Sequence, residues 1–388
     1  MQVDYKPSEE ALRPLVVPQR LLLGAGPSNC HPRVLKASAQ QMLTVVCPEF
    51  YAVMDDIRAG LKYFFQTTNE LTLAIDGAGH AAMETSLVNV VEPGDRVLIL
   101  ENGIWSQRAR EIADRCGAIV KSIVCPLGEF FPHKEIEEGL QTFKPHVLFT
   151  CQGESSTGVL QPIEGIGDLC RQHDCLLIVD GVASFGGVPF FMDRWNVDIA
   201  YSGSQKVLSA PPGLSPISFG PRARAKMASR KTKVQSFYFD INWLMKYWAV
   251  DGATRVYHHT ASVSLYYALK ESLAMLAEEG LEASWSKHKR NAELLWEGLE
   301  KLGLELFVKD KAARLPTVTA IKIPPGMNFT VFNTYMAHTH SLEVAGGLGP
   351  AATKVWRIGL LGNNARSENV VAVLKAVGDG LKHMSSSL

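Results

Sequence analysis

Short, continuous apolar runs that end in polar loops constrain the fold of this chain more than any other feature. The run Cys175–Val179 is followed by Asp180, and the shorter run Ile199–Tyr201 leads through small residues to Lys206. Strands that are apolar at successive positions are typical of a parallel sheet covered on both faces. Because ligands of such sheets bind beyond the carboxyl ends of the strands, we expect Asp180 and Lys206 to face one pocket.

The same pattern recurs through the preceding part of the chain. Apolar runs at Leu71–Ile75, Arg96–Leu100 and Val147–Thr150 each lead into a polar or glycine-containing loop, and helical stretches separate them. Strands that alternate with helices form right-handed βαβ units. The sequence therefore predicts an α/β fold built on a mostly parallel, doubly wound sheet.

The pattern changes from about Leu281, where a smaller α+β domain is predicted. We expect a long amphipathic helix, then strands, then a closing helix, at residues 284–302, 316–323, 342–345, 355–360 and 368–382. At the other end, prolines 7, 14 and 18 predict an extended arm that lies either on its own domain or on a partner subunit. The expected division is an N-terminal arm, a large domain and a small C-terminal domain, at residues 1–20, 21–282 and 283–388.

Composition excludes several classes of protein. The 39 basic and 39 acidic side chains balance, so no overall field favours nucleic acid or an anionic membrane. No apolar run approaches the roughly 20 residues of a membrane helix, and the polar start does not predict a secretory signal. The seven cysteines include no CxxC pair, which favours a reducing intracellular compartment. The ending Ser386-Ser387-Leu388 is similar to a peroxisomal address without its central base; a polar tail, with a cytoplasmic or mitochondrial location, is the alternative.

A lysine and an aspartate in one pocket suggest a particular cofactor. Pyridoxal phosphate is held by a lysine Schiff base, and a carboxylate pairs with its ring nitrogen. Trp105, which follows a predicted strand at a helix start, would supply an aromatic face for such a ring, although a tryptophan there also fits the core. Arg357 stands among apolar neighbours and needs a carboxylate, which is either internal or part of a substrate.

The glycine loop Asp76–His80 supports more than one interpretation. It lies between a predicted strand and a helix N-terminus, where free backbone N–H groups bind phosphate. Gly77 and Gly79 also begin a dinucleotide-type pattern, with Glu101 about 24 residues after Gly77, which makes an NAD-dependent dehydrogenase a rival. A turn that serves packing alone is the third alternative.

Two further clusters invite a function. Six basic residues between Pro221 and Lys233 lack interleaved aromatics, so a solvated helix face and loop is preferred over nucleic-acid binding. The adjacent histidines of Tyr257–Thr260 point in different directions and have no H-E-x-x-H motif or cysteine partner, so no metal site is predicted.

Taken in chain order, the motifs closely resemble those of the alanine–glyoxylate (serine–pyruvate) aminotransferase family, which are class V, fold-type I enzymes dependent on pyridoxal 5'-phosphate. The resemblance covers nearly the whole chain from about Arg20, and the ordered set is far more specific than any one motif. The motifs are Gly24–Asn29, Asp76–His80, Asn102–Trp105, Gln152–Gly158, Val179–Ser184, Tyr201–Lys206, Tyr257–Thr260 and Gly346–Arg357.

The resemblance implies a role for each matching residue around the cofactor ring. Lys206 would form the Schiff base and shuttle protons, and Asp180 would pair with the pyridinium nitrogen. Trp105 would stack on one face of the ring and Val182 would pack against the other. Ser155 would contact both cofactor and substrate.

The resemblance also implies how the phosphate and the substrate are held. Gly26, Ser155 and Arg357 would bind substrate, with Arg357 clamping its carboxylate. The phosphate would be held in a homodimer, by Ala78, Gly79, His80 and Gln205 of one subunit and by Tyr257 and Thr260 of the other. The chain departs from the family at Ala25, where proline is usual, and at Asp76 and Ala78, where serines are usual. The loss of a hydroxyl there would leave backbone N–H groups to bind the phosphate.

The implied activity is a ping-pong transamination of a small amino acid, alanine or serine, with glyoxylate or pyruvate as acceptor; alanine and glyoxylate would give pyruvate and glycine. A 3-hydroxykynurenine transaminase that uses glyoxylate is the close alternative. The dehydrogenase, and a non-catalytic protein on the same fold, are the distant ones.

Overall fold

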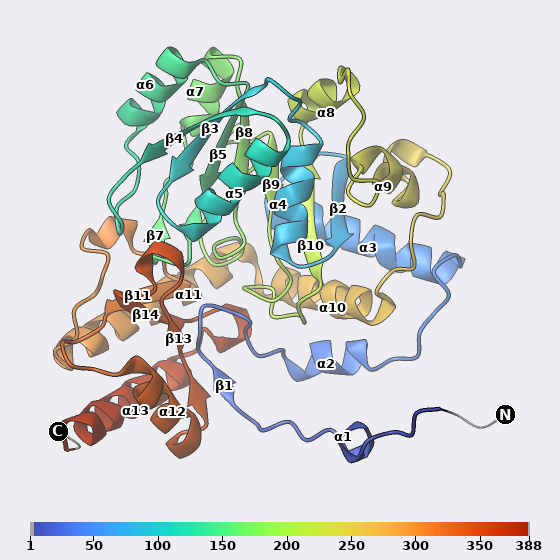
Figure 1. Cartoon of the computed structure of the whole chain (residues 1–388). Helices are drawn as coiled ribbons and strands as arrows, with labels where there is room; N and C mark the ends of the chain where they lie inside the picture. The colour runs from blue at the N-terminus through green and yellow to red at the C-terminus, as the bar shows by residue number, and fades with distance from the viewer. Residues whose placement is uncertain (1–3, 387–388) are drawn as a thin grey trace.

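The computed structural model describes residues 4–386, and its main element is a seven-stranded sheet (Figure 1). The strand order is β2-β10-β9-β8-β5-β3-β4. The pairs on the β4 side, from β9 to β4, are parallel, whereas β10 runs antiparallel to both β2 and β9. The strands are β2 (Leu71–Asp76), β3 (Arg96–Glu101), β4 (Ile119–Val124), β5 (Val147–Cys151), β8 (Leu176–Asp180), β9 (Ile199–Tyr201) and β10 (Leu214–Phe219).

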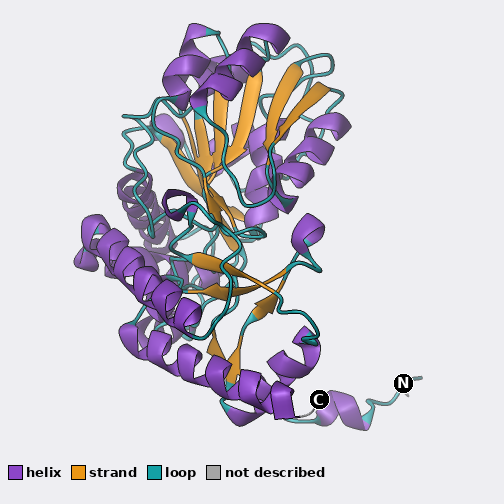
Figure 2. Cartoon of the chain, turned by 90° about the vertical axis from the view of Figure 1, so that its left-hand side faces the viewer, coloured by secondary structure: helices purple, strands orange, loops and turns teal. Residues whose placement is uncertain are grey.

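Helices cover both faces of this sheet, as the edge-on view in Figure 2 shows. Every residue of β5 and β8 is buried, which explains why these strands are apolar without alternation. The covering helices are α3 (Pro48–Phe65), α4 (Gly79–Val88), α5 (Ile104–Arg115), α6 (His133–Phe143), α7 (Ile166–Gln172), α8 (Pro221–Ala228), α9 (Ile241–Tyr247) and α10 (Val263–Glu279). The predicted α/β fold with a doubly wound sheet is confirmed, with one antiparallel strand inserted.

The C-terminal part has a second hydrophobic core, around a three-stranded antiparallel sheet of order β11-β14-β13. Trp356 and Phe332 are fully buried in this core. Its elements are α11 (Leu281–Lys301), β11 (Val318–Lys322), α12 (Phe329–Thr339), β12 (Leu342–Glu343), β13 (Ala345–Gly346), β14 (Val355–Gly359) and α13 (Ser367–Ser386). Short 3₁₀ helices lie at Val250–Gly252, Lys311–Ala313, Gly349–Ala351 and Gly362–Asn364.

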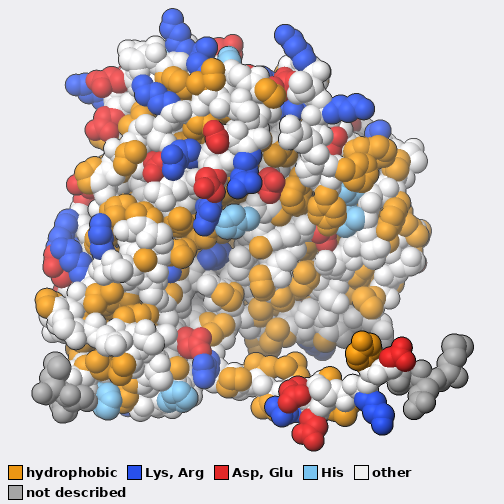
Figure 3. All heavy atoms as spheres, viewed as in Figure 1, with side chains coloured by type: hydrophobic (Ala, Val, Ile, Leu, Met, Phe, Trp, Pro, Cys, Tyr) orange, Lys and Arg blue, Asp and Glu red, His pale blue; other side chains and the backbone are white. Residues whose placement is uncertain are grey.

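The N-terminal segment leaves the body of the molecule as an extended arm (Figures 1 and 3). One short helix, α1 (Glu9–Leu12), interrupts it, a turn that the prolines of this stretch did not predict. After the arm, β1 (Leu21–Leu22) pairs in parallel with β12, and α2 (Pro32–Ser38) begins at a proline. The N-terminal strand therefore joins the C-terminal part of the chain, and the expected domain boundary at residue 282 stays a prediction.

Differences from the sequence-based elements have physical reasons. Strand β10 escaped prediction because Pro216 and two serines, Ser215 and Ser218, interrupt its apolar pattern, although all six of its residues are buried. Helix α11 begins at Leu281, three residues earlier than expected, directly after Gly280 ends α10. Residues 387 and 388 of the Ser386-Ser387-Leu388 ending lie outside the described residues.

All seven cysteines are free thiols. Several of the basic residues near α8 form ion pairs with acidic side chains. Arg222 lies 3.0 Å from Asp198, and Lys226 lies 2.9 Å from Asp95. Within residues 4–386, none of the helices has the length and apolar composition that a bilayer crossing requires.

Candidate active site

The carboxyl ends of the strands bring Asp180 and Lys206 into one pocket of about 100 Å³. Asp180 is the last residue of β8, and Lys206 follows β9, the neighbouring parallel strand. This is the edge at which α/β sheets bind ligands. The lining residues are Ala78, Gly79, His80, Met83, Trp105, Gly153, Ser155, Asp180, Val182, Ala183, Gln205 and Lys206.

The Asp180 carboxylate is buried and fixed by two donors. Its Oδ1 accepts a hydrogen bond of 2.8 Å from the backbone N–H of Val182, and its Oδ2 accepts one of 2.8 Å from the Tyr201 hydroxyl. Burial raises the pKa of Asp180 to about 6, against the effect of these two hydrogen bonds and of Lys206. A cationic group in the pocket would offset the cost of burying this charge.

The Lys206 amine is less basic than an ordinary lysine. Burial, together with the nearby charge of Arg357, lowers its pKa to about 8, against the opposite effect of Asp180. Its Nζ donates a hydrogen bond to the carbonyl of Ala25. Gly26 leaves the room that this side chain occupies, because a Cβ at that position would lie 2.8 Å from the Lys206 Cε. The neutral amine that can accept a proton is therefore more populated near neutral pH.

Arg357 lies on β14 and has no carboxylate partner among the described residues. Its Nε and Nη2 donate to the carbonyl of Gly346 at 2.8 and 2.6 Å, and its Nη1 donates to the carbonyl of Ser155 at 3.0 Å. Burial lowers its pKa to about 10, against the charge of Glu154. The internal-carboxylate alternative is thus not what the structure shows. A buried guanidinium oriented by carbonyls is suited to an anionic ligand.

Trp105 is held at the start of α5 by the loop after β5. Its Nε1 donates to the Ser155 hydroxyl at 2.8 Å, and its backbone N–H donates to Glu154 at 3.2 Å. Its ring meets the His80 ring edge-on, with centroids 5.4 Å apart. Glu154 also accepts from Ser156, and burial raises its pKa to about 7. Trp105 therefore presents a fixed aromatic surface to the pocket.

The start of α4 offers backbone donors to the pocket. Ala78 is the N-cap and its side chain makes no capping hydrogen bond, so the first N–H groups of the helix are available to a ligand. Gly79 permits close packing, since a Cβ there would lie 3.2 Å from Val182. Gln205 also lines the pocket, and the NH2 group of its side-chain amide can donate to an anion. These groups fit a phosphate at a helix N-terminus, and Ala78, Gly79, His80 and Gln205, which were predicted to hold it, all line the pocket.

Asp76, one of the departures from the family pattern, does not line the pocket. Its carboxylate accepts from His259 Nε2 at 2.9 Å, from the Tyr266 hydroxyl at 2.7 Å and from the Ser262 backbone N–H at 2.9 Å. Burial opposes its ionisation, but the bonds to His259 and Tyr266 prevail and lower its pKa. Asp76 thus ties the end of β2 to the segment that carries Tyr257 and Thr260.

The structure does not bring Tyr257 and Thr260 to this pocket within one chain. Their hydroxyls lie 2.8 Å apart, and Tyr257 is 56% exposed. Among residues 4–386 no cluster of histidine, cysteine, aspartate and glutamate is arranged to hold a metal ion. Glu101, the acid of the dinucleotide interpretation, accepts from Gln107 at 3.0 Å and lies 3.6 Å from Arg110.

Sequence reasoning assigned no role to several residues that the site contains. Met83, Gly153 and Ala183 line the pocket. Glu154 accepts a hydrogen bond from the backbone N–H of Trp105. The signal for Glu154 was an acidic residue among hydroxyls directly after a buried strand. Met83 had no such signal, because only the packing of α4 turns it toward the pocket.

The comparisons with known proteins assign this fold and site to a class. The family model described as Aminotransferase class-V matches residues 21–373, and the chain belongs to that family. Class-V aminotransferases use pyridoxal 5'-phosphate, and the chain has their fold-type I architecture. Membership excludes the NAD-dependent dehydrogenase alternative.

Three similar proteins are alanine–glyoxylate or related glyoxylate transaminases. It is 51% identical to the alanine–glyoxylate aminotransferase of Rattus norvegicus over 98% of this chain and 92% of the relative. It superimposes on the alanine–glyoxylate aminotransferase structure of Nostoc sp. with a TM-score of 0.92 and 48% identity, covering 95% of this chain and 97% of that one. The (S)-ureidoglycine–glyoxylate transaminase of Bacillus subtilis is 35% identical over 93% of this chain and 90% of the relative.

The Asp76 network generates a stability prediction. We expect Asp76→Asn to lower the free energy of unfolding at pH 7 by about 1–3 kcal/mol, because it removes the charge of a buried acceptor that takes hydrogen bonds from three donors. Since the folded pKa of Asp76 is lowered, its contribution is present above the unfolded value of 3.8 and is lost as the pH falls through the folded value.

Urea unfolding of the variant and wild type at pH 7 and near pH 3 measures this difference. Asp56→Asn is the matched control, because that carboxylate is 61% exposed and 3.8 Å from Lys270. Equal destabilisation by the two substitutions at pH 7 would contradict the role given to Asp76.

Proposed function

We propose that this chain transfers the amino group of alanine to glyoxylate, giving pyruvate and glycine in a ping-pong cycle. Family membership and the similarity to two alanine–glyoxylate aminotransferases support this activity. One observation carries it at the level of the site. Lys206 and Asp180 share a pocket, and the charge of a buried Arg357 without a carboxylate partner reaches Lys206.

The residues of the pocket fit pyridoxal 5'-phosphate. When bound, this cofactor supplies an electron sink for the negative charge that remains when the α-proton of an amino acid is removed. Asp180 would face the ring nitrogen and favour its protonated form, because a nearby carboxylate stabilises a cation. Trp105 and Val182 would enclose the ring, Ser155 would contact it, and the N-terminus of α4 with Gln205 would hold the phosphate.

Lys206 would perform the proton transfers. Its pKa of about 8 lies close to neutral pH, so the same amine can accept the α-proton and return it. The room at Gly26 and the carbonyl of Ala25 keep the side chain inside the pocket. Because the amine already lies beside the substrate, proton transfer occurs within the complex and needs no collision with a base from solution.

Arg357 would set the choice of substrate. Three hydrogen bonds to carbonyls fix the plane of its guanidinium, so that a carboxylate binds in one orientation. Arg357 stands just outside the lining, and within the described residues the lining itself includes no arginine for a distal carboxylate. This composition favours small donors, alanine or serine, over dicarboxylic amino acids.

We also propose that the protein is a homodimer whose subunits complete each other's site. Tyr257 and Thr260 are not among the residues that line their own pocket, and they lie next to a cluster of exposed aromatic rings that includes Phe237 and Trp243. The arm adds Leu15 and other apolar side chains that are almost fully exposed. Apolar surface of this extent is typical of an interface.

The finer statements on organisation and location belong to the same proposal. The large domain would extend to residue 282, because later residues contribute to the second hydrophobic core. The arm of residues 1–20 would lie on the partner subunit. A peroxisomal location, suggested by Ser386-Ser387-Leu388, stays a prediction.

We expect Lys206→Ala to reduce transamination between alanine and glyoxylate at least about a thousandfold, because it removes the amine that accepts and returns the α-proton. The visible absorbance of lysine-bound cofactor should vanish with it. Product formation is measured with alanine, serine, 3-hydroxykynurenine and (S)-ureidoglycine as donors, and wild type should prefer alanine. Lys270→Ala, in which the lysine is exposed, is the control. Full turnover by Lys206→Ala would refute the assignment.

Arg357→Lys should raise the KM for both alanine and glyoxylate about tenfold or more, since an ammonium cannot offer two parallel N–H donors to a carboxylate. Steady-state kinetics with each substrate varied measures the change. Arg290→Lys, on the exposed face of α11, is the control, because it replaces a guanidinium with an ammonium away from the pocket. An unchanged KM for both substrates would remove Arg357 from the site.

The shared site predicts complementation between two defective chains. Lys206→Ala is mixed with the double variant Tyr257→Phe, Thr260→Val, and hybrid dimers are isolated by two different tags. If the sites are shared, each hybrid has one site with Lys206 and both hydroxyls, and turnover at limiting cofactor should rise above that of either parent. Hybrids no more active than the double variant would show that each chain builds its site alone.

A further inference from the structure

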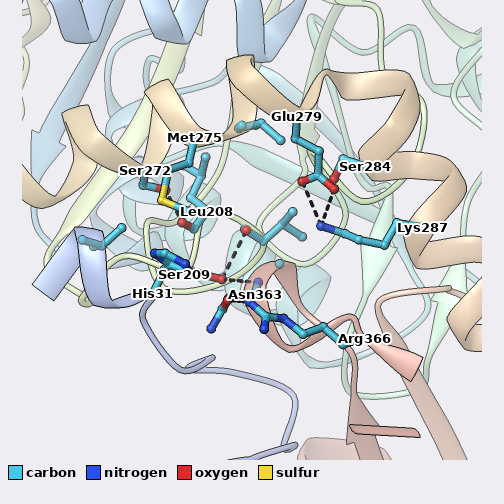
Figure 4. Close-up of a pocket in the computed structure, with 14 residues that line it drawn as sticks. His31, Leu208, Ser209, Ser272, Met275, Glu279, Ser284, Lys287, Asn363 and Arg366 are labelled. Carbon is cyan, nitrogen blue, oxygen red and sulfur yellow. Dashed lines mark hydrogen bonds and ion pairs between the residues drawn. The ribbon is translucent and has the colours of Figure 1, made fainter. Parts of the chain in front are cut away.

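A second pocket, of about 230 Å³, lies between α2, α10, α11 and the turn at Gly362–Asn364 (Figure 4). Val207, Leu208 and Ser209 form part of its wall, and these residues directly follow Lys206. The two pockets have no lining residue in common. Lys206 lines the first pocket and the three residues after it line the second, so one backbone segment borders both cavities.

The interior of this pocket is mainly apolar. Val34 and Leu276 are buried, Met275 is half-buried, and Val207 contributes a further aliphatic surface. Pockets for drug-sized ligands have roughly 300–1,000 Å³, so this one suits a smaller molecule. Its walls call for an apolar body on that molecule.

The rim of the pocket carries positive charge. Lys287 is paired with Glu279, with Nζ and Oε2 2.8 Å apart. Arg366 is exposed, and its side chain donates a hydrogen bond to the Asn363 amide oxygen; no ion pair involves it in the part of the chain that the structure describes. Figure 4 shows Arg366 extending toward the opening that His31 borders from the other side. The available partner for a ligand is thus a guanidinium, which matches a carboxylate.

A chain of hydrogen bonds links this rim to Lys206. The Ser209 hydroxyl accepts from the backbone N–H of Asn363 at 2.9 Å and lies 3.0 Å from the Ser28 hydroxyl. The Ser28 hydroxyl in turn donates to the carbonyl of Lys206 at 2.8 Å. A ligand on Arg366 and Asn363 would act on the same turn that holds Ser209, and through it on the backbone of Lys206.

We propose that this pocket is an effector site for a small monocarboxylic acid with an apolar body. The carboxylate binds Arg366, the body packs against Val34, Val207 and Met275, and occupancy shifts the position of Lys206 through Ser209 and Ser28. The coupling rests on the proposed transamination, whereas binding itself does not. A failure of one is therefore distinguishable from a failure of the other.

The test measures binding of 3-fluorobenzoate to the cofactor-loaded dimer by fluorine NMR. The Arg357→Lys background weakens competing binding at the active site. We expect saturable binding that Arg366→Glu weakens at least about tenfold. Arg290→Glu, an exposed arginine outside both pockets, should leave it unchanged. Met275→Trp, which fills the cavity without touching the charge, is the second variant and should also abolish binding.

The coupling is measured in the protein with native Arg357. Saturating 3-fluorobenzoate should shift the visible absorbance of the bound cofactor and change kcat, and Arg366→Glu should remove both effects while its own basal activity is unchanged. Absence of saturable binding up to about 10 mM, or binding that both pocket variants leave intact, overturns the site. Binding without a spectral or kinetic effect overturns the coupling.

Discussion

The burial of an acid and two cations near one another is the constraint on which the site depends, with Asp180 and Lys206 at the carboxyl ends of the seven-stranded sheet and Arg357 on β14 of the smaller sheet. Asp180, Lys206 and Arg357 have no ion pairs with one another within the described residues, and burial moves the pKa of each toward its neutral form. Charges in such surroundings are costly unless a ligand completes them. The protein tolerates them because backbone donors and carbonyls already orient each group, so a ligand with opposite charges finds its partners in place.

The residues around these charges give the site its shape. Glu154 and Ser155 connect Trp105 to the backbone that also holds Arg357, so the aromatic face and the guanidinium are positioned by one loop. On the opposite side, Asp76 fixes the segment 257–262 to the end of β2. The family departure at Asp76 thus replaces a short polar side chain with a buried charged network, away from the pocket. In the proposed site, the phosphate would be held by backbone N–H groups at the start of α4 together with Gln205.

Connections between distant parts of the chain determine how the site is coupled to its surroundings. Ser28 and Ser209 join the first loop, the lysine segment and the turn at Asn363, which come from three remote regions of the sequence. The exposed aromatic cluster and the N-terminal arm would make similar connections between two chains. Both offer apolar surface that a single subunit leaves uncovered, as the proposed dimer requires.

The sequence by itself determined the sheet and the placement of two key residues. The apolar runs of β5 and β8 have no alternation because both faces are buried, and a polar residue after such a run must lie at the ligand edge. That local rule located Asp180 and Lys206. It missed β10, where Pro216 breaks the pattern. Only the tertiary structure could decide that Arg357 lies near enough for its charge to lower the pKa of Lys206, and that Asp76 bonds to His259 and Tyr266 outside the pocket. Contacts between residues so far apart depend on how the elements pack, and no local pattern records that packing.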